Sequence, residues 1–89
     1  MDITTVDLAP ILAGAVGVRE IPHDEAGFED VLLLELGLDS LAVLEVLSAI
    51  KQRWGVSMPD DAVDGTTTVS MLLELTNVAL RAANAKAAS

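Results

Sequence analysis

The segment LGLDSLAVLEVL, residues 36–47, sets a carboxylate beside a small nucleophile in the most apolar part of the chain, with Asp39 directly before Ser40. A catalytic serine needs a base within hydrogen-bond reach and usually occupies a Gly-x-Ser-x-Gly turn. This segment does not match that turn, and the only histidine, His23, lies in a polar stretch that nothing marks as catalytic. The sequence therefore argues against hydrolase chemistry within this chain.

A second group of reactive residue types is the acidic run DDAVD at residues 60–64, which Gly65 follows. A calcium-binding loop would need an oxygen ligand at its third position and a glutamate at its twelfth. Those positions hold Ala62 and Met71. We therefore interpret the run as the acidic start of a short helix, where negative charge is favourable, and expect no metal site.

The charge balance narrows the classes of partner. The chain has 14 acidic and 5 basic residues, which gives a net charge of −9. Proteins that bind nucleic acid show the opposite balance, so we expect no nucleic-acid partner. The acidic surface serves either solubility alone or encounter with basic patches on partner proteins, and composition does not choose between these two readings.

The size and composition predict one domain, residues 1–89, because a hydrophobic content of 52% supplies a single core. The absence of cysteine rules out disulfides and thiolate metal sites, and it fits a cytoplasmic protein. Acidic residues interrupt the apolar region 31–50, so no membrane span is expected. The apolar stretch 8–18 follows Asp2 and Asp7, where a signal peptide would carry positive charge.

The first helix is predicted over about residues 6–16, with Asp7 as its cap and Gly17 at its end. Pro10 is compatible with this helix only in the first turn, where backbone N–H groups have no partner. The side chains at helical spacing are Ile11, Leu12, Ala15 and Val16.

A long connection over about residues 18–39 follows, and it is expected to pack down and to hold a short helical turn. Leu33 and Leu34 cannot both point inward together with the other apolar residues of this connection. The residues expected to pack are Phe28, Val31, Leu32 and Leu36.

The second helix, residues 40–54, has the clearest pattern: one apolar stripe that ends before Gly55. The stripe consists of Val43, Val46, Leu47, Ile50 and Trp54. A short helix at residues 60–63 and a last helix that opens in the threonine cluster 66–68 complete the chain, and residues 82–89 are expected to fray. The inward side chains of the last helix are Val69, Leu72, Leu73, Thr76 and Leu80. These elements predict an all-α fold, a small four-helix bundle with a long loop after helix 1 and a short third helix.

Asp39 and Ser40 are both good N-cap residues, so a purely structural role is one reading of the pair. The second helix also carries Leu41 and Leu44 off its buried stripe, on a face shared with Ser48 and edged by Glu45. This second apolar patch beside Ser40 suggests a docking surface. A helix N-terminus also favours a phosphate group, so Ser40 is well placed to carry a phosphodiester.

The string LGLDSL at residues 36–41, followed by Glu45 on the same helix, resembles the modification site of acyl carrier proteins. The segment WGVSMPDD at 54–61 resembles the family's connection into its short third helix, and TTV at 67–69 resembles the start of its last helix. The resemblance covers roughly residues 32–80. The three strings at suitable spacing are together more specific than the Asp-Ser-Leu string alone.

The resemblance implies that Ser40 is modified with 4′-phosphopantetheine, which a phosphopantetheinyl transferase takes from coenzyme A. The thiol of this arm would hold acyl intermediates as thioesters and present them to partner enzymes, so the chain itself would not be an enzyme. Asp39 would help to present the serine and would contact the transferase. The partner-facing positions of the family match Leu41, Leu44 and Glu45.

The end of the second helix, KQR at residues 51–53, is basic where bacterial fatty-acid carriers are acidic, and Ser48 replaces a bulkier apolar residue. Cations also suit a helix C-terminus, so helix design alone could explain the charge. The segment RWGVSMPDD, residues 53–61, is most similar to the discrete carriers of bacterial type II (aromatic) polyketide synthases. The resemblance then implies a monomer in polyketide and antibiotic biosynthesis, served by a ketosynthase/chain-length factor, an acyltransferase and tailoring enzymes.

Other identities stay open on the sequence. A fatty-acid carrier is one alternative, and a peptidyl carrier is another, although such carriers usually have glycine-rich residues where this chain has Leu38 and Asp39. An unmodified helical module that binds proteins through Leu41 and Leu44 is the alternative from a different functional class.

Overall fold

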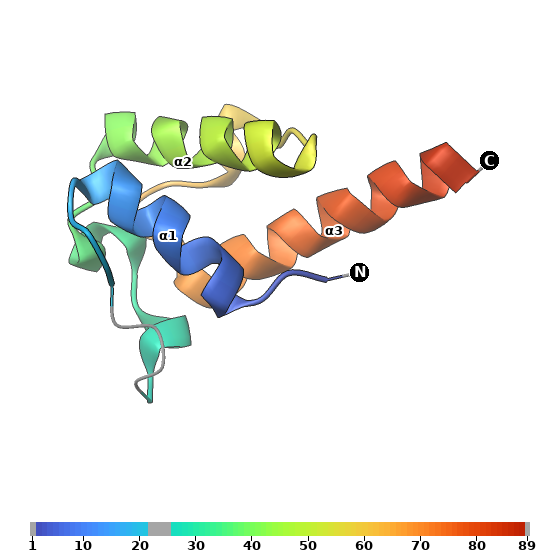
Figure 1. The fold of residues 1–89 in the computed structure, drawn as a ribbon. Coiled ribbons are helices and arrows are strands. Elements are labelled where there is room, and N and C mark those ends of the chain that lie inside the picture. Colours follow the sequence, from blue (N-terminus) through green and yellow to red (C-terminus); the bar gives the residue numbers. More distant parts are fainter. Residues whose placement is uncertain (1, 22–25, 89) are drawn as a thin grey trace.

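The computed structural model describes residues 2–21 and 26–88. Three α-helices, α1 (Thr5–Val16), α2 (Ser40–Trp54) and α3 (Val69–Ala88), are joined by irregular segments (Figure 1). These segments contain three short 3₁₀ turns, η1 (Phe28–Asp30), η2 (Leu33–Leu36) and η3 (Asp60–Ala62). Within the described ranges no strand forms, so the all-α class is confirmed. The expected short third helix is only the 3₁₀ turn η3, so the structure has three α-helices rather than four.

Helix α1 differs from the sequence prediction in its N-cap, in the position of Pro10 and in the side chains that it buries. Its N-cap is Thr4, whose N–H donates to the Asp7 carboxylate at 2.9 Å, so Asp7 supports the cap from inside the first turn. Pro10 lies beyond the first turn, which contradicts the prediction for it. Leu8 and Ala13 are buried where the pattern placed Ala15 and Val16, which are only half-buried. Gly17 ends the helix as predicted.

Helix α2 has the predicted bounds, and its stripe forms the centre of the core. Val43, Val46, Leu47 and Ile50 are buried, and they pack with Leu8 and Leu12 of α1 and Leu72 of α3 in one cluster. Trp54 differs from the prediction because it is only half-buried, with the Arg53 guanidinium 5.5 Å from the centre of its ring. In the view of Figure 1, α1 passes between α2 and α3, and buried side chains of all three helices belong to the one cluster.

The long connection after α1 packs down through residues that periodicity did not identify. Phe28 is buried as predicted, but Leu33 and Leu38 are also buried, and Leu34 is exposed. The predicted short helical turn is present twice, as η1 and η2. His23 lies outside the described residues.

Backbone hydrogen bonds fasten this connection to the segment that leads into α3. The Leu33 N–H donates to the Thr67 carbonyl at 2.9 Å, and the Leu34 N–H donates to the Gly65 carbonyl at 3.0 Å. A Cβ at Gly65 would lie 3.1 Å from the Leu34 Cβ, so the absence of a side chain permits this close approach. These bonds hold the two irregular segments side by side.

Helix α3 opens at the predicted threonine cluster, where the Thr68 hydroxyl accepts a hydrogen bond from the Met71 N–H at 3.1 Å. Its inward side chains follow the prediction, except that Leu73 is half-buried. The sequence prediction missed Asn77, which is buried and binds the N-terminal segment. The Ile3 N–H donates to Asn77 Oδ1 at 2.7 Å, and Asn77 Nδ2 donates to the Ile3 carbonyl at 3.1 Å.

The C-terminal part of α3 extends beyond the other elements, away from the start of α2 (Figure 1). Backbone helix continues to Ala88, and the fraying expected for residues 82–89 stays a prediction about the protein in solution. Within residues 2–21 and 26–88, no helix combines the length and the apolar character that a bilayer crossing requires.

Candidate functional site: the start of α2 and its pocket

Ser40 is the first residue of α2, and it is exposed. The chain reaches it through Gly37, whose φ of 97° lies in the left-handed region that glycine adopts without strain. Leu38 is buried immediately before the helix and fixes the path of the chain. The sequence therefore sets Ser40 at a rigid helix start with its hydroxyl at the surface.

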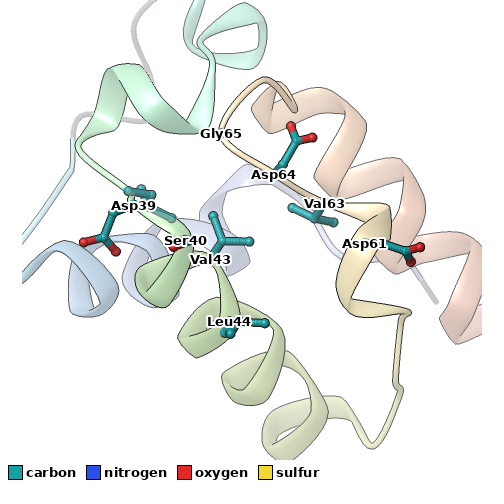
Figure 2. A pocket seen from close by; sticks show the side chains of 9 residues that line it. Asp39, Ser40, Val43, Leu44, Asp61, Val63, Asp64 and Gly65 are labelled. Carbon is teal, nitrogen blue, oxygen red and sulfur yellow. The ribbon is translucent and has the colours of Figure 1, made fainter.

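Asp39 is the N-cap of α2. Its Oδ1 accepts a hydrogen bond from the Ala42 N–H at 2.8 Å, and its carbonyl accepts from the Val43 N–H at 2.9 Å. The carboxylate points away from the pocket beside Ser40 (Figure 2). Asp39 therefore caps the helix, and no part of the described chain arranges it and Ser40 as a base and a nucleophile.

A pocket of about 580 Å³ opens beside Ser40, between α2 and the wall formed by η3 and the segment before α3. Its apolar lining comes from Leu38, Val43, Leu44 and Val63. Figure 2 shows Val43 and Val63 facing each other across the gap, while Asp61 and Asp64 turn outward at the rim. An apolar group attached to Ser40 can therefore enter the pocket without desolvating a carboxylate.

The far wall of this pocket was not found by sequence reasoning. Val63 and Gly65 lie in irregular chain with no periodic pattern, and Asp61 and Asp64 were weighed only as metal ligands or as the acidic start of a short helix. The wall depends on hydrogen bonds between segments far apart in sequence, which a single sequence does not display. The nearest signal is the sequence resemblance of residues 54–61 to the carrier family.

The Asp64 carboxylate is held by Thr66 at the pocket rim. The Thr66 hydroxyl and the Thr66 N–H, the latter at 2.8 Å, both donate to Asp64 Oδ1. The hydroxyl contact, followed by the backbone contact, holds the pKa of Asp64 below its usual range. Asp64 therefore organises the turn into α3, and among the described residues no group of three or more His, Asp or Glu side chains could hold a metal ion.

The predicted docking residues lie together on the outer face of α2. Leu41 is 71% exposed and Leu44 is 43% exposed, although both are large and apolar. Glu45 and Ser48 are also exposed on the same helix. The helix thus buries one apolar stripe and displays a second patch, as the sequence predicted.

The chain matches one family over residues 7–76, and that family is described as a phosphopantetheine attachment site. The oxytetracycline polyketide synthase acyl carrier protein of Streptomyces rimosus is 38% identical over 85 residues, which cover 96% of this chain and 90% of that protein. The actinorhodin polyketide synthase acyl carrier protein of Streptomyces coelicolor is 36% identical over 78 residues, which cover 88% of this chain and 91% of that protein.

Solved structures give the same result. The 3,5-dioxohexyl acyl carrier protein of the Streptomyces coelicolor actinorhodin polyketide synthase, described as a triketide mimic, superposes with a TM-score of 0.77 at 36% identity. That match covers 93% of this chain and 96% of the other. The actinorhodin holo acyl carrier protein superposes with a TM-score of 0.75 at 36% identity, with coverage of 93% and 96%. The chain therefore belongs to the phosphopantetheine-attachment family, as an acyl carrier protein of the polyketide synthase type.

Proposed function

We propose that Ser40 carries 4′-phosphopantetheine and that the chain thereby tethers polyketide intermediates for a bacterial type II (aromatic) polyketide synthase. The observation that carries this proposal is the position of Ser40, exposed at the first residue of α2 and at the mouth of an apolar pocket. The arm supplies a thiol that holds the acyl group as a thioester. The protein's own residues position that arm and catalyse no step.

The start of α2 suits a phosphodiester. Asp39 occupies the Ala42 and Val43 N–H groups, whereas the Ser40 and Leu41 N–H groups have no acceptor within the described residues. Free N–H groups at a helix N-terminus, together with the helix dipole, favour an anion there. The modification therefore adds negative charge at the N-terminus of α2, which is the end of the helix where an anion is most favourable.

Asp39 and the outer face of α2 have separate roles in this proposal. Asp39 fixes the helix start and presents its carboxylate to the transferase, and Leu41, Leu44, Glu45 and Ser48 contact the enzymes that use the arm. Two large exposed leucines beside the attachment point support the assignment. Their contacts bury apolar area only while an enzyme is docked, so the carrier can exchange between enzymes.

The partners of the proposed function are a phosphopantetheinyl transferase, a ketosynthase/chain-length factor, an acyltransferase and tailoring enzymes. The names of the Streptomyces relatives support this set and a role in antibiotic biosynthesis. The chain would act as a monomer in the cytoplasm, with neither nucleic acid nor a membrane as partner. The net charge of −9 supports partners with basic docking surfaces.

Incubation with coenzyme A and a broad-specificity phosphopantetheinyl transferase, followed by intact-mass measurement, tests the proposal. We expect the mass to increase by one phosphopantetheine in the wild-type protein and not at all in Ser40→Ala. Ser70→Ala is the matched control, because it removes an exposed serine on α3, outside the proposed docking face, and leaves modification intact.

The outcome also separates the alternatives. A folded wild-type protein that gains no mass would contradict the proposal and favour the unmodified interaction module. A mass gain that survives Ser40→Ala would move the attachment point elsewhere. Loading of the modified protein by a type II ketosynthase, compared with loading by a fatty-acid ketosynthase, then tests the polyketide assignment.

A further inference from the structure

Another groove lies between α1 and α2, and it borders the docking face at Glu45. It has a volume of about 310 Å³, and it is lined by Pro10, Ile11, Gly14, Ala15, Glu45 and Ala49. Because Glu45 also belongs to the proposed docking face, the groove continues that face onto α1. The pocket beside Ser40 contains none of these residues, so the groove is a separate feature.

Two residues of the α1 wall, Pro10 and Gly14, are unfavourable in a helix. Pro10 and Gly14 both lie inside α1, one turn apart, and both are exposed. Proline and glycine are the two least favourable residues in a helix interior. Their spacing at i and i+4 places them on one side of the helix, which is the side that lines the groove.

The fold itself does not require a glycine at residue 14. Its φ is not among the positive values found in the structure, and a Cβ built there would meet nothing within 4 Å. Alanine would therefore fit and would stabilise the helix. The missing side chain leaves open space on the surface, and an approaching molecule can use that space.

The charges around the groove define what can approach. Glu45 is exposed at the groove, and α1 contains no basic residue. Within the described chain the only ion pair joins Asp2 and Arg81, so Glu45 has no cation of its own. An occupant therefore needs a positive charge for Glu45 and an apolar stem for the surface of Gly14, Ala15 and Ala49. Arginine and lysine side chains have this combination.

We propose that the α1/α2 groove seats one long cationic side chain of the phosphopantetheinyl transferase, with its charged end on Glu45 and its stem between the helices. This inference rests on the proposed function, since it assumes an enzyme docked at the start of α2. It assigns α1 a part in docking and names the chemistry of the docking residue.

Gly14→Leu fills the groove from the α1 side, and kcat/KM for phosphopantetheine transfer measures the result. Loss of one seated anchor is expected to lower kcat/KM about tenfold. Gly14→Ala narrows the groove by a single methyl group, so its kcat/KM should lie between those of wild type and Gly14→Leu. Ser70→Leu, which exposes a leucine on α3 instead, controls for added apolar surface. Thermal melting shows that each variant is folded.

A double-variant cycle with Glu45→Gln completes the test. Stem and charge belong to one seated side chain, so Gly14→Leu should have less effect on kcat/KM when Glu45→Gln is already present. Wild-type kinetics for a folded Gly14→Leu, or effects of the two variants that simply add, would overturn the groove proposal. Absence of any transfer to the wild-type protein would instead overturn the proposed function, so the two failures are distinguishable.

Discussion

At the scale of single residues, the pair that first suggested a nucleophile and its base separates into two roles. Asp39 Oδ1 accepts a hydrogen bond from the Ala42 N–H, and Ser40 is exposed to solvent. The missing base is consistent with this division, because an attachment point is modified by a visiting enzyme and needs no activation from its own chain. The chemistry therefore depends on how Ser40 is positioned.

Substitution of Asp39 separates its cap from its charge. Asp39→Ala should lower the free energy of unfolding by about 1 kcal/mol, because the Ala42 N–H loses its side-chain acceptor. Asp39→Asn keeps an acceptor oxygen, so it should retain nearly all of the stability. Denaturant unfolding measures both variants.

Loading kinetics of the same variants test the proposed contact with the transferase. Asp39→Asn should load more slowly than wild type despite its retained stability, because the carboxylate charge is gone. Equal loss of stability in both variants would show that the carboxylate charge, and not the hydrogen bond to the Ala42 N–H, stabilises the helix start. If Asp39→Asn loads at the wild-type rate, the carboxylate charge does not contribute to docking of the transferase.

At the scale of elements, the sequence predicted best where side chains repeat. The bounds of α2 and its stripe from Val43 to Ile50 follow from helical spacing, and the structure confirms them. Leu33 and Leu38 were missed because 3₁₀ turns and extended chain give no such period. In α1, Leu12 is buried as predicted and Ile11, Ala15 and Val16 are partly buried against the core, whereas the expectation for Pro10 was wrong because packing of Leu8 and Leu12 sustains a helix around it.

The candidate site was predictable to the same extent. The residues on α2 were identified from one helix and one resemblance, since they need only local spacing. The pocket wall requires the hydrogen bonds that join the long connection to residues 65–67, and such non-local pairs leave no local pattern in a single sequence. Asn77 was missed for a related reason, because its partner is Ile3 at the other end of the chain.

The contact of Asn77 with Ile3 should hold the N-terminal segment on α3. Asn77→Ala removes both hydrogen bonds and leaves the buried Ile3 N–H without a partner, which should lower the free energy of unfolding by about 1–3 kcal/mol. The neighbouring ion pair of Asp2 and Arg81 is a natural comparison, because both side chains are substantially exposed.

Arg81→Ala should therefore lower the free energy of unfolding by less than Asn77→Ala does. Chemical denaturation of the two variants under identical conditions measures the difference. A larger effect for Arg81→Ala than for Asn77→Ala would contradict the inference that the buried Asn77 amide holds the N-terminal segment on α3.

At the scale of the whole molecule, the net charge of −9 makes acid titration informative. Arg81 lowers the pKa of Asp2 through a hydrogen bond, and Thr66 lowers the pKa of Asp64 in the same way. A carboxyl with a lower pKa in the folded state binds fewer protons there than in the unfolded state. Its stabilisation is present above about pH 4 and is lost as the pH falls through the lowered native value.

The double variant Asp2→Asn/Asp64→Asn should therefore lose less stability than wild type between about pH 5 and pH 2. Asp61→Asn is the control, since the Asp61 carboxylate makes no hydrogen bond within the described chain. Thermal unfolding over this pH range, followed by circular dichroism, provides the comparison. If wild type and the double variant lose stability equally as the pH falls, these two carboxyls do not contribute to the acid dependence of stability.

The projecting part of α3 has a practical consequence for biophysical work. Because the sequence has no cysteine, Asn84→Cys would give the unmodified protein a single thiol at an exposed position on that helix. A fluorophore would be attached there before the arm is installed, and the C-terminal part of α3 extends away from the start of α2 (Figure 1). The carrier can thus report its own encounters with enzymes through anisotropy, without a probe on the surface where they dock.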